Sequence, residues 1–118
     1  MKKNNSNPLK INEYHTLVNK LFLLIEENID KNQEKCDIDC ELHHNMLIIN
    51  LNNTNQVIIN KQESLKQIWL ATKKNGYHFE YINKQWICNR TKKDFWNVLQ
   101  ESCVYQTNKC IQFLKNIY

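Results

Sequence analysis

The first regular pattern along the chain is an apolar stripe with helical spacing. From residue 12 onward, apolar side chains recur at steps of three and four residues: Tyr14, Leu17, Val18, Leu21, Phe22, Ile25 and Ile29. This spacing places them on one face of a helix and leaves the opposite face polar. The sequence therefore predicts an amphipathic helix that ends near Asn32.

After this helix the period changes to two, which is typical of strands with one buried face. In residues 37–42 the acids Asp37, Asp39 and Glu41 alternate with Ile38, Cys40 and Leu42. Five further strands are predicted at 46–51, 56–61, 66–71, 77–81 and 85–88. The Asn-rich segment 52–55 and the Asn-Gly pair at 75–76 separate some of them, so we expect consecutive antiparallel hairpins.

A second helix is predicted after the strands. Residues 91–94, Thr-Lys-Lys-Asp, resemble a capping box, and the segment that follows carries Phe95, Leu99 and Cys103. The order helix, strands, helix predicts an α+β fold. We expect a two-layer sandwich: an antiparallel sheet of five to six strands has an N-terminal and a C-terminal helix on one face, and its other face is in solvent.

The length of 118 residues predicts one domain. We expect a disordered polar N-terminus over residues 1–10 and a single domain over residues 11–118. Near the C-terminus the apolar residues Ile111, Phe113 and Ile117 are expected to cover the groove between the two helices.

The composition predicts a soluble cytoplasmic protein. No stretch approaches the roughly 20 apolar residues of a membrane helix, and the first residues do not form an apolar signal core. The five cysteines are odd in number and unevenly spaced, unlike a disulfide framework, so we expect reduced thiols.

The charge is distributed very unevenly. Residues 26–41 hold seven acids and two lysines, a net charge of −5, whereas the rest of the chain holds five acids and fourteen Lys or Arg, a net charge of +9. A basic protein thus carries one concentrated acidic surface, and partners of opposite charge can use different faces.

The acids of this segment are candidate metal ligands, because carboxylate oxygens suit hard or borderline cations. The end of the helix and the first strand are expected to meet at one edge and to pool their charge. His15 lies on the same helix edge as Glu26. The alternative is a solvated acidic face. The candidate ligands, for a site that is open and weak, are His15, Glu26, Glu27, Asp30, Glu34, Asp37, Asp39 and Glu41.

Trp69 is the second candidate for function. If Ile68 and Leu70 face the helices, strand alternation puts Trp69 and Gln67 on the solvent face, beside Asn60 of the neighbouring strand. An exposed Trp flanked by amides is typical of an interface anchor. A Trp packed under a loop, or a register slip of one residue, is the alternative.

Two other groups of residues are weaker candidates for a functional site. The spacing of Cys36, Cys40, His43 and His44 suggests a zinc or cluster site, but Cys40 alternates to the core face, so buried or idle thiols are favoured. Lysines and an arginine gather in the loops of residues 73–93, yet the nearby Tyr77 and Tyr81 share strand parity with the core, which argues against nucleic-acid binding. The sequence contains no phosphate loop, nucleophile elbow or HExxH motif, so no catalytic residue is expected.

Several segments resemble one known family. They are VIINKQESLKQIWLATK at 57–73, followed by GYHF at 76–79 and WIC at 86–88, together with IEENID at 25–30 and DIDCEL at 37–42. These segments are very similar to the frataxin family and closest to its bacterial CyaY branch. The resemblance runs from about residue 11 to the end of the second helix.

The resemblance implies a non-enzymatic regulator of iron-sulfur cluster assembly. It implies weakly bound iron, Fe²⁺ or Fe³⁺, on an acidic ridge, and docking to the cysteine desulfurase and the scaffold protein, with a monomer in the absence of iron. A ferroxidase or iron-storage protein is the alternative. The ridge positions match at His15, Glu26, Glu27, Asp30, Asp37, Asp39 and Glu41, and the sheet-surface positions at Asn60, Gln62, Gln67 and Trp69. Bacterial relatives carry further acids where Lys31, Gln33 and Lys35 stand here, so the ridge is thinned.

Overall fold

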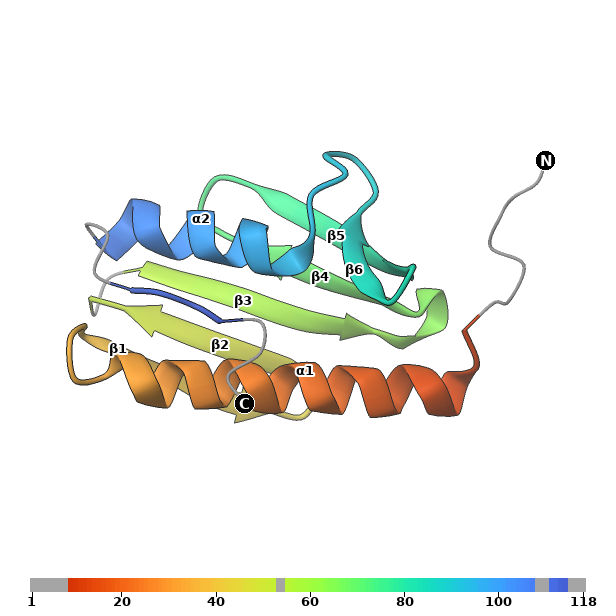
Figure 1. The fold of residues 1–118 in the computed structure, drawn as a ribbon, viewed down its shortest axis with the longest axis horizontal. Helices are drawn as coiled ribbons and strands as arrows, with labels where there is room; N and C mark the ends of the chain where they lie inside the picture. Colours follow the sequence, from red (N-terminus) through yellow and green to blue (C-terminus); the bar gives the residue numbers. More distant parts are fainter. Residues whose placement is uncertain (1–8, 53–54, 108–110, 115–118) are drawn as a thin grey trace.

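The chain folds into two layers, an antiparallel sheet with two helices on one side of it (Figure 1). The computed structural model describes residues 9–52, 55–107 and 111–114. Within these ranges the elements are, in chain order, α1 (Ile11–Asn32), β1 (Ile38–His43), β2 (Met46–Leu51), β3 (Asn55–Gln62), the short 3₁₀-helix η1 (Glu63–Leu65), β4 (Gln67–Ala71), β5 (Gly76–Ile82), β6 (Gln85–Cys88) and α2 (Phe95–Thr107). The six described strands form one sheet in the order β1-β2-β3-β4-β5-β6, which confirms the predicted α+β sandwich.

Strand alternation decides which side chains enter the core. In the pairing of β3 with β4, Ile59 lies opposite Leu70 on the helix side, while Asn60 lies opposite Trp69 on the other side. Ile59, Ile68 and Leu70 are fully buried. The predicted parity of β4 is therefore confirmed, and the sheet face opposite the helices, called here the open face, carries Trp69.

A buried hydrogen bond joins α1 to β4. The hydroxyl of Tyr14 donates to the backbone carbonyl of Gln67 over 2.7 Å, and Tyr14 has no exposed surface. Burial raises the pKa of the Tyr14 hydroxyl to about 12. The first turns of α1 are thereby fixed to the strand that carries Trp69.

Three local predictions need correction. The strand expected from residue 66 begins at Gln67, because Lys66 takes the left-handed conformation with φ 53° that ends η1. The second helix is capped by Asp94, whose Oδ1 accepts a hydrogen bond from the backbone N–H of Asn97 at 2.9 Å, and not by Thr91. Leu42, expected on the covered face of β1, is 55% exposed, since β1 is an edge strand with a neighbour on one side only.

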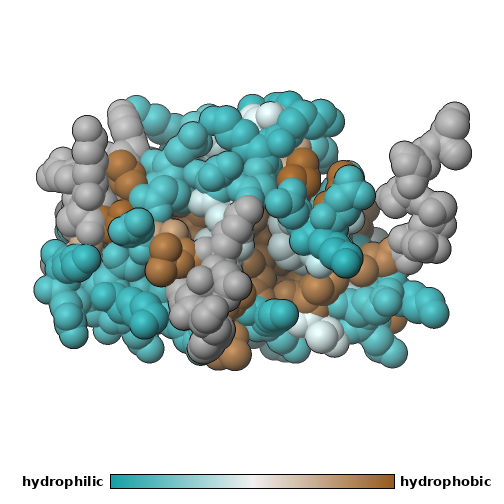
Figure 2. All heavy atoms as spheres, in the orientation of Figure 1, coloured by the Kyte–Doolittle hydropathy of each residue, from teal (hydrophilic) through white to brown (hydrophobic). Residues whose placement is uncertain are grey.

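Residues near both ends of the chain pack on the core. Leu9 contacts the core cluster, so packing begins before the predicted boundary at residue 11. Ile111 and Phe113 are buried in the groove between α1 and α2, as predicted, and Ile117 lies outside the described residues. The visible surface on this side is mostly hydrophilic, and its apolar atoms lie mainly between the two helices (Figure 2).

The prediction that all cysteines are reduced is wrong for Cys36, which is disulfide-bonded. Cys40, Cys88 and Cys103 are not disulfide-bonded, and Cys110 lies outside the described residues. Strand and helix periodicity cannot reveal such a link, because it depends on which segments the fold brings together. In the described part of the chain, no helix combines the length and apolar character needed to span a membrane.

Candidate functional site

Trp69 is held rigidly on the open face. Its indole ring stacks on the ring of His78, the residue opposite it in β5, with 4.0 Å between centroids and 8° between planes. Its Nε1–H donates a 2.7 Å hydrogen bond to Oε1 of Gln67. The ring is half-buried by these contacts. A preorganised aromatic of this kind loses little conformational freedom when a partner covers it.

The amides around Trp69 have different degrees of access. Asn60 and Gln62, on β3, lie opposite Trp69 and Gln67 and are partly exposed. Gln67 also points to the open face, but it is only 9% exposed, and its Nε2 donates to Glu80 over 3.2 Å. Gln67 therefore positions Trp69 more than it offers a surface of its own, which sequence parity alone did not show.

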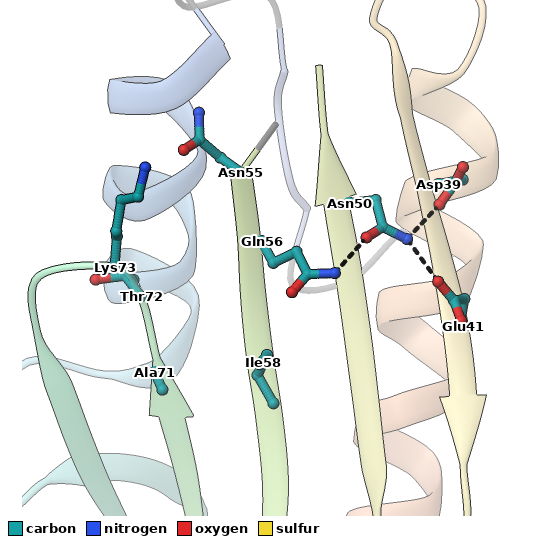
Figure 3. Close-up of a pocket in the computed structure, with 9 residues that line it drawn as sticks. All are labelled: Asp39, Glu41, Asn50, Asn55, Gln56, Ile58, Ala71, Thr72 and Lys73. Atoms are coloured by element: carbon teal, nitrogen blue, oxygen red, sulfur yellow. Dashed lines mark hydrogen bonds between the residues drawn. The ribbon is translucent and has the colours of Figure 1, made fainter. Parts of the chain in front are cut away.

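A hollow of about 550 Å³ lies on the open face beside the edge strand β1 (Figure 3). Asn50 of β2 donates through its Nδ2 to Asp39 at 2.8 Å and to Glu41 at 2.9 Å. Gln56 of β3 donates in turn to the Oδ1 of Asn50 at 2.9 Å. Lys73 lines the hollow from the side opposite the two acids. The hollow thus has one anionic wall, an amide floor and one cationic wall.

The position of Glu41 also affects its titration. A hydrogen bond from Asn50 and a second contact, 3.0 Å long, with Nε2 of His43 lower the pKa of the Glu41 carboxyl below its ordinary value. Both Glu41 and His43 are about half exposed. The carboxylate form of Glu41 is therefore favoured, as a cation ligand requires.

Carboxylates of α1 lie on the other side of β1. Burial raises the pKa of the Cys40 thiol to about 11, and the negative charges of Glu26, Asp30 and Asp39 add to this effect. The helix acids Glu26 and Asp30 and the strand acid Asp39 therefore lie near the same thiol. We call the seven acids of residues 26–41 the acidic edge: Glu26, Glu27, Asp30, Glu34, Asp37, Asp39 and Glu41.

His15 is not part of this neighbourhood. Its Nε2 lies 3.6 Å from a carboxylate oxygen of Glu63, and its Nδ1 is 3.3 Å from Nζ of Lys61. Glu26 is eleven residues further along α1, or about 16 Å along the helix axis. The two residues share a helix edge, but they are too far apart to bind one metal ion together.

The acidic edge does not form a closed metal cage. Among the residues that the structure describes, no group of three His, Cys, Asp or Glu side chains lies close enough to hold a metal ion. A cation on this edge would bind one or two carboxylates and keep water in its other positions, which gives low affinity. Glu26 and Glu27 are partly buried, whereas Asp30 and Glu34 are exposed.

The structure does not bring together the residues of the alternative zinc site or of the alternative nucleic-acid site. Cys36 is disulfide-bonded, Cys40 faces the helices, and His43 pairs with Glu41 on the open face, so these side chains do not converge on a zinc site. Tyr77 and Tyr81 pack against the core, as predicted. The basic loops therefore lack these two rings as stacking platforms for nucleic acid.

Sequence reasoning missed the supporting residues of the open face. Asn50 bridges two acids, and His78 forms the surface on which Trp69 lies. Both residues have outward parity in their strands, and this signal was available. Their partners depend on strand pairing, which places His78 and Asn50 beside residues 9 to 11 positions away in the sequence.

A family model, the Frataxin-like domain, matches residues 7–109. The chain belongs to the frataxin family. It is 47% identical over 115 residues to the iron-sulfur cluster assembly protein CyaY of Buchnera aphidicola from Acyrthosiphon pisum (strain Tuc7), covering 98% of this chain and 99% of that protein. The CyaY protein of the Schizaphis graminum strain is 46% identical, over 96% of this chain and 93% of that protein.

Solved structures of frataxins share the fold. The frataxin of Psychromonas ingrahamii, described as belonging to the CyaY family, superposes with a TM-score of 0.82 at 31% identity and covers 90% of this chain and 99% of that one. A trimeric frataxin from Saccharomyces cerevisiae, complexed with ferrous iron, has a TM-score of 0.63 at 23% identity over 94% of this chain and 92% of that one. The yeast comparison supports the fold.

Proposed function

We propose that this frataxin-family protein is a non-enzymatic, iron-binding accessory of iron-sulfur cluster assembly. It carries iron weakly on the acidic edge and docks to the cysteine desulfurase and the scaffold protein through the open face. The observation that carries the proposal is the 47% identity, over 98% of the chain, to proteins named for iron-sulfur cluster assembly.

The open face supports the docking part of the proposal. Trp is enriched among residues that dominate binding energy, and here the ring of Trp69 is fixed by His78 and Gln67 before any partner arrives. Asn60 and Gln62 add accessible amides beside it. Since the helices cover only the opposite side of the sheet, a partner can approach this face without unfolding any element (Figure 1).

The acidic edge supports the iron part. Its carboxylates are hard donors, and the net charge of −5 over residues 26–41 attracts a cation, while the remaining +9 leaves other surfaces for acidic partners. Exposed Lys31 and Lys35, which are included in this charge of −5, offset part of the negative charge of the seven acids. We therefore expect binding in the micromolar range or weaker, with fewer ions than a fully acidic ridge would hold.

Anaerobic titration with Fe²⁺, followed by NMR line broadening, tests the iron site. Broadening should begin at residues 26–41 and should weaken in the double variant Glu26→Gln with Asp30→Asn. The matched control, Glu13→Gln with Glu101→Gln, removes two exposed acids elsewhere and should broaden like the wild type. Broadening centred outside residues 26–41, or equal in both double variants, would show that iron does not bind at the acidic edge.

A reconstituted assembly reaction with the desulfurase, the scaffold and several iron concentrations tests the function itself. The protein should change the rate of cluster formation, and the change should depend on iron. The Glu26→Gln, Asp30→Asn variant should have a smaller effect at equal iron. An unchanged rate at every iron concentration would refute the proposed function even if the titration locates iron at the acidic edge.

A further inference from the structure

The loop between β4 and β5 is followed by the only glycine of the chain, and an asparagine comes directly before it. The loop consists of Thr72, Lys73, Lys74 and Asn75, and Gly76 begins β5. In an Asn-Gly pair the main chain can attack the asparagine side chain most easily, because glycine has no Cβ to obstruct the approach. Such an attack requires an accessible carboxamide and a main-chain nitrogen that is not held by a neighbouring strand.

The side chain of Asn75 is open to solvent. Asn75 and Gly76 are both exposed, and Asn75 lies at a hollow of about 590 Å³ that Lys73 and Tyr77 also line. Asn75 forms its hydrogen bonds through its main chain: its N–H donates to Oγ1 of Thr72 at 3.0 Å, and its carbonyl accepts from the N–H of Thr72 at 2.8 Å. Among the described residues no hydrogen bond holds its carboxamide, which can therefore rotate toward Gly76.

The amide nitrogen of Gly76 lies outside the hydrogen-bond ladder between β4 and β5. Thr72 and Asn75 are joined by a main-chain hydrogen bond. In an antiparallel hairpin the next pair, Ala71 with Gly76, is therefore a non-hydrogen-bonded pair, and its N–H and C=O groups point away from each other. The carbonyl of Gly76 has this direction, since it accepts a 2.8 Å hydrogen bond from Nη2 of Arg90. The nitrogen that would attack Asn75 is thus not held by β4.

The fold does not require a glycine at residue 76. Gly76 does not have a positive φ, and an added Cβ would meet no atom within 4 Å. An alanine at this position therefore fits without strain, and it restricts the unfolded chain slightly. Gly76→Ala changes the approach to the side chain of Asn75 and leaves the hairpin intact.

We propose that Asn75 is a site of spontaneous deamidation in the folded protein. The amide nitrogen of Gly76 bonds to Cγ of Asn75, the C–N bond of the carboxamide breaks, and ammonia leaves with the proton that the nitrogen gives up. Water then opens the succinimide ring. Cleavage between the nitrogen and Cγ gives aspartate, and cleavage between the nitrogen and the main-chain carbonyl carbon gives isoaspartate. Each event consumes one water and releases one ammonia.

The product changes both the charge and the main chain of the loop. The new carboxylate lies next in sequence to Lys74 and lowers the net charge of the protein by one. In isoaspartate the main chain runs through the former side chain and is one carbon longer, just where Thr72 and Asn75 close the hairpin. This site is separate from the acidic edge, and its chemistry goes beyond the proposed function.

Peptide mapping of the full chain tests the proposal. The folded protein is incubated at neutral pH and physiological temperature, and its peptides are analysed by mass spectrometry. The peptide with residues 75–76 should gain the mass difference between an amide and an acid, and heavy-oxygen water should increase this gain. An isoaspartyl methyltransferase should label the same peptide. Asn50 and Asn83, which are followed by Leu51 and Lys84, should stay unchanged over the same time.

Two variants separate attack by the main chain from direct hydrolysis of the carboxamide. Gly76→Ala should deamidate several-fold more slowly than the wild type, because the added methyl group obstructs the attack, and its thermal unfolding should be unchanged. Asn75→Gln should show no mass gain at this peptide over the same time, because its ring would be larger and closes more slowly. Equal rates in Gly76→Ala and the wild type would overturn the proposal.

Protein unfolded in guanidinium chloride is the reference for the effect of the fold. Folded protein should deamidate at Asn75 within a few-fold of the rate of unfolded protein. If only the unfolded protein reacts, the hairpin keeps the two groups apart and the proposal is overturned. Equal deamidation of Asn50, Asn75 and Asn83 in the folded protein would also overturn it, because Asn75 would then not be a distinct site.

Discussion

Replacing Trp69 by alanine should weaken partner binding strongly while the protein still folds. The change removes a ring that lies on the open face, stacked on His78 and hydrogen-bonded to Gln67. Loss of the stack costs about 0.5–1.5 kcal/mol of folding free energy. Loss of one hydrogen bond costs about 1 kcal/mol. We therefore expect the free energy of unfolding to fall by about 1.5–2.5 kcal/mol.

The expected loss of binding free energy is similar or larger in size. Truncation of a hot-spot aromatic costs about 2 kcal/mol or more of binding free energy, which is roughly a thirty-fold loss of affinity. Calorimetric titration against the desulfurase and scaffold measures this loss at a temperature where the variant is still folded. Urea unfolding followed by circular dichroism measures the stability change in the same preparation.

Two variants serve as controls for Trp69→Ala. Trp69→Phe keeps a ring to stack on His78 and loses only the Nε1–H donor, so both affinity and stability should lie between those of alanine and the wild type. Trp86 is 7% exposed and contacts the rings of Tyr14 and Tyr81, so Trp86→Ala should cost the 3–5 kcal/mol typical of a deleted core aromatic.

Either of two results would contradict this role of Trp69. If Trp69→Ala destabilises the protein as much as Trp86→Ala, the ring contributes to the core and not to a surface. If Trp69→Ala stays folded and binds both partners with unchanged affinity, the open face near Trp69 is not the docking surface.

Three further predictions follow from the contacts and charges described above. Glu26→Gln with Asp30→Asn should leave the free energy of unfolding in urea titrations unchanged or raise it by a few tenths of a kcal/mol, because like charges at this spacing repel each other. A loss above about 1 kcal/mol would mean that the two carboxylates stabilise the fold. Tyr14→Phe should cost about 1–2 kcal/mol because the carbonyl of Gln67 loses its donor. The raised pKa of Tyr14 stabilises the fold below pH 10, and this contribution is lost as the pH rises toward 12. Tyr14→Phe should therefore lose less stability than the wild type between pH 10 and pH 12. Equal losses in unfolding experiments would contradict the burial of the hydroxyl. Glu41→Gln should flatten the loss of stability in acid, because the lowered pKa of Glu41 stabilises the fold above pH 4.5 and this contribution disappears as the pH falls through the folded pKa; parallel acid unfolding curves would contradict it.

The sequence by itself determined the elements and their faces. Helical and strand periods are local properties, so the stripe on α1 and the alternation in β4 predicted which side of each element enters the core. For the same reason Trp69 was placed correctly on the open face before any pairing was known. The family resemblance also rested on contiguous segments, and the match to residues 7–109 confirmed it.

Contacts between distant segments were decided only by the tertiary structure. Asn28 and Asn32 look like polar residues of an exposed helix face, yet they are buried because segments 80 and 86 residues away bring main-chain groups to them. His15 shares a helix edge with Glu26, but the rise of the helix keeps them apart, and Lys61 of β3 and Glu63 of η1 are its partners instead. Periodicity fixes the direction of a side chain, whereas chain packing fixes what the side chain meets there.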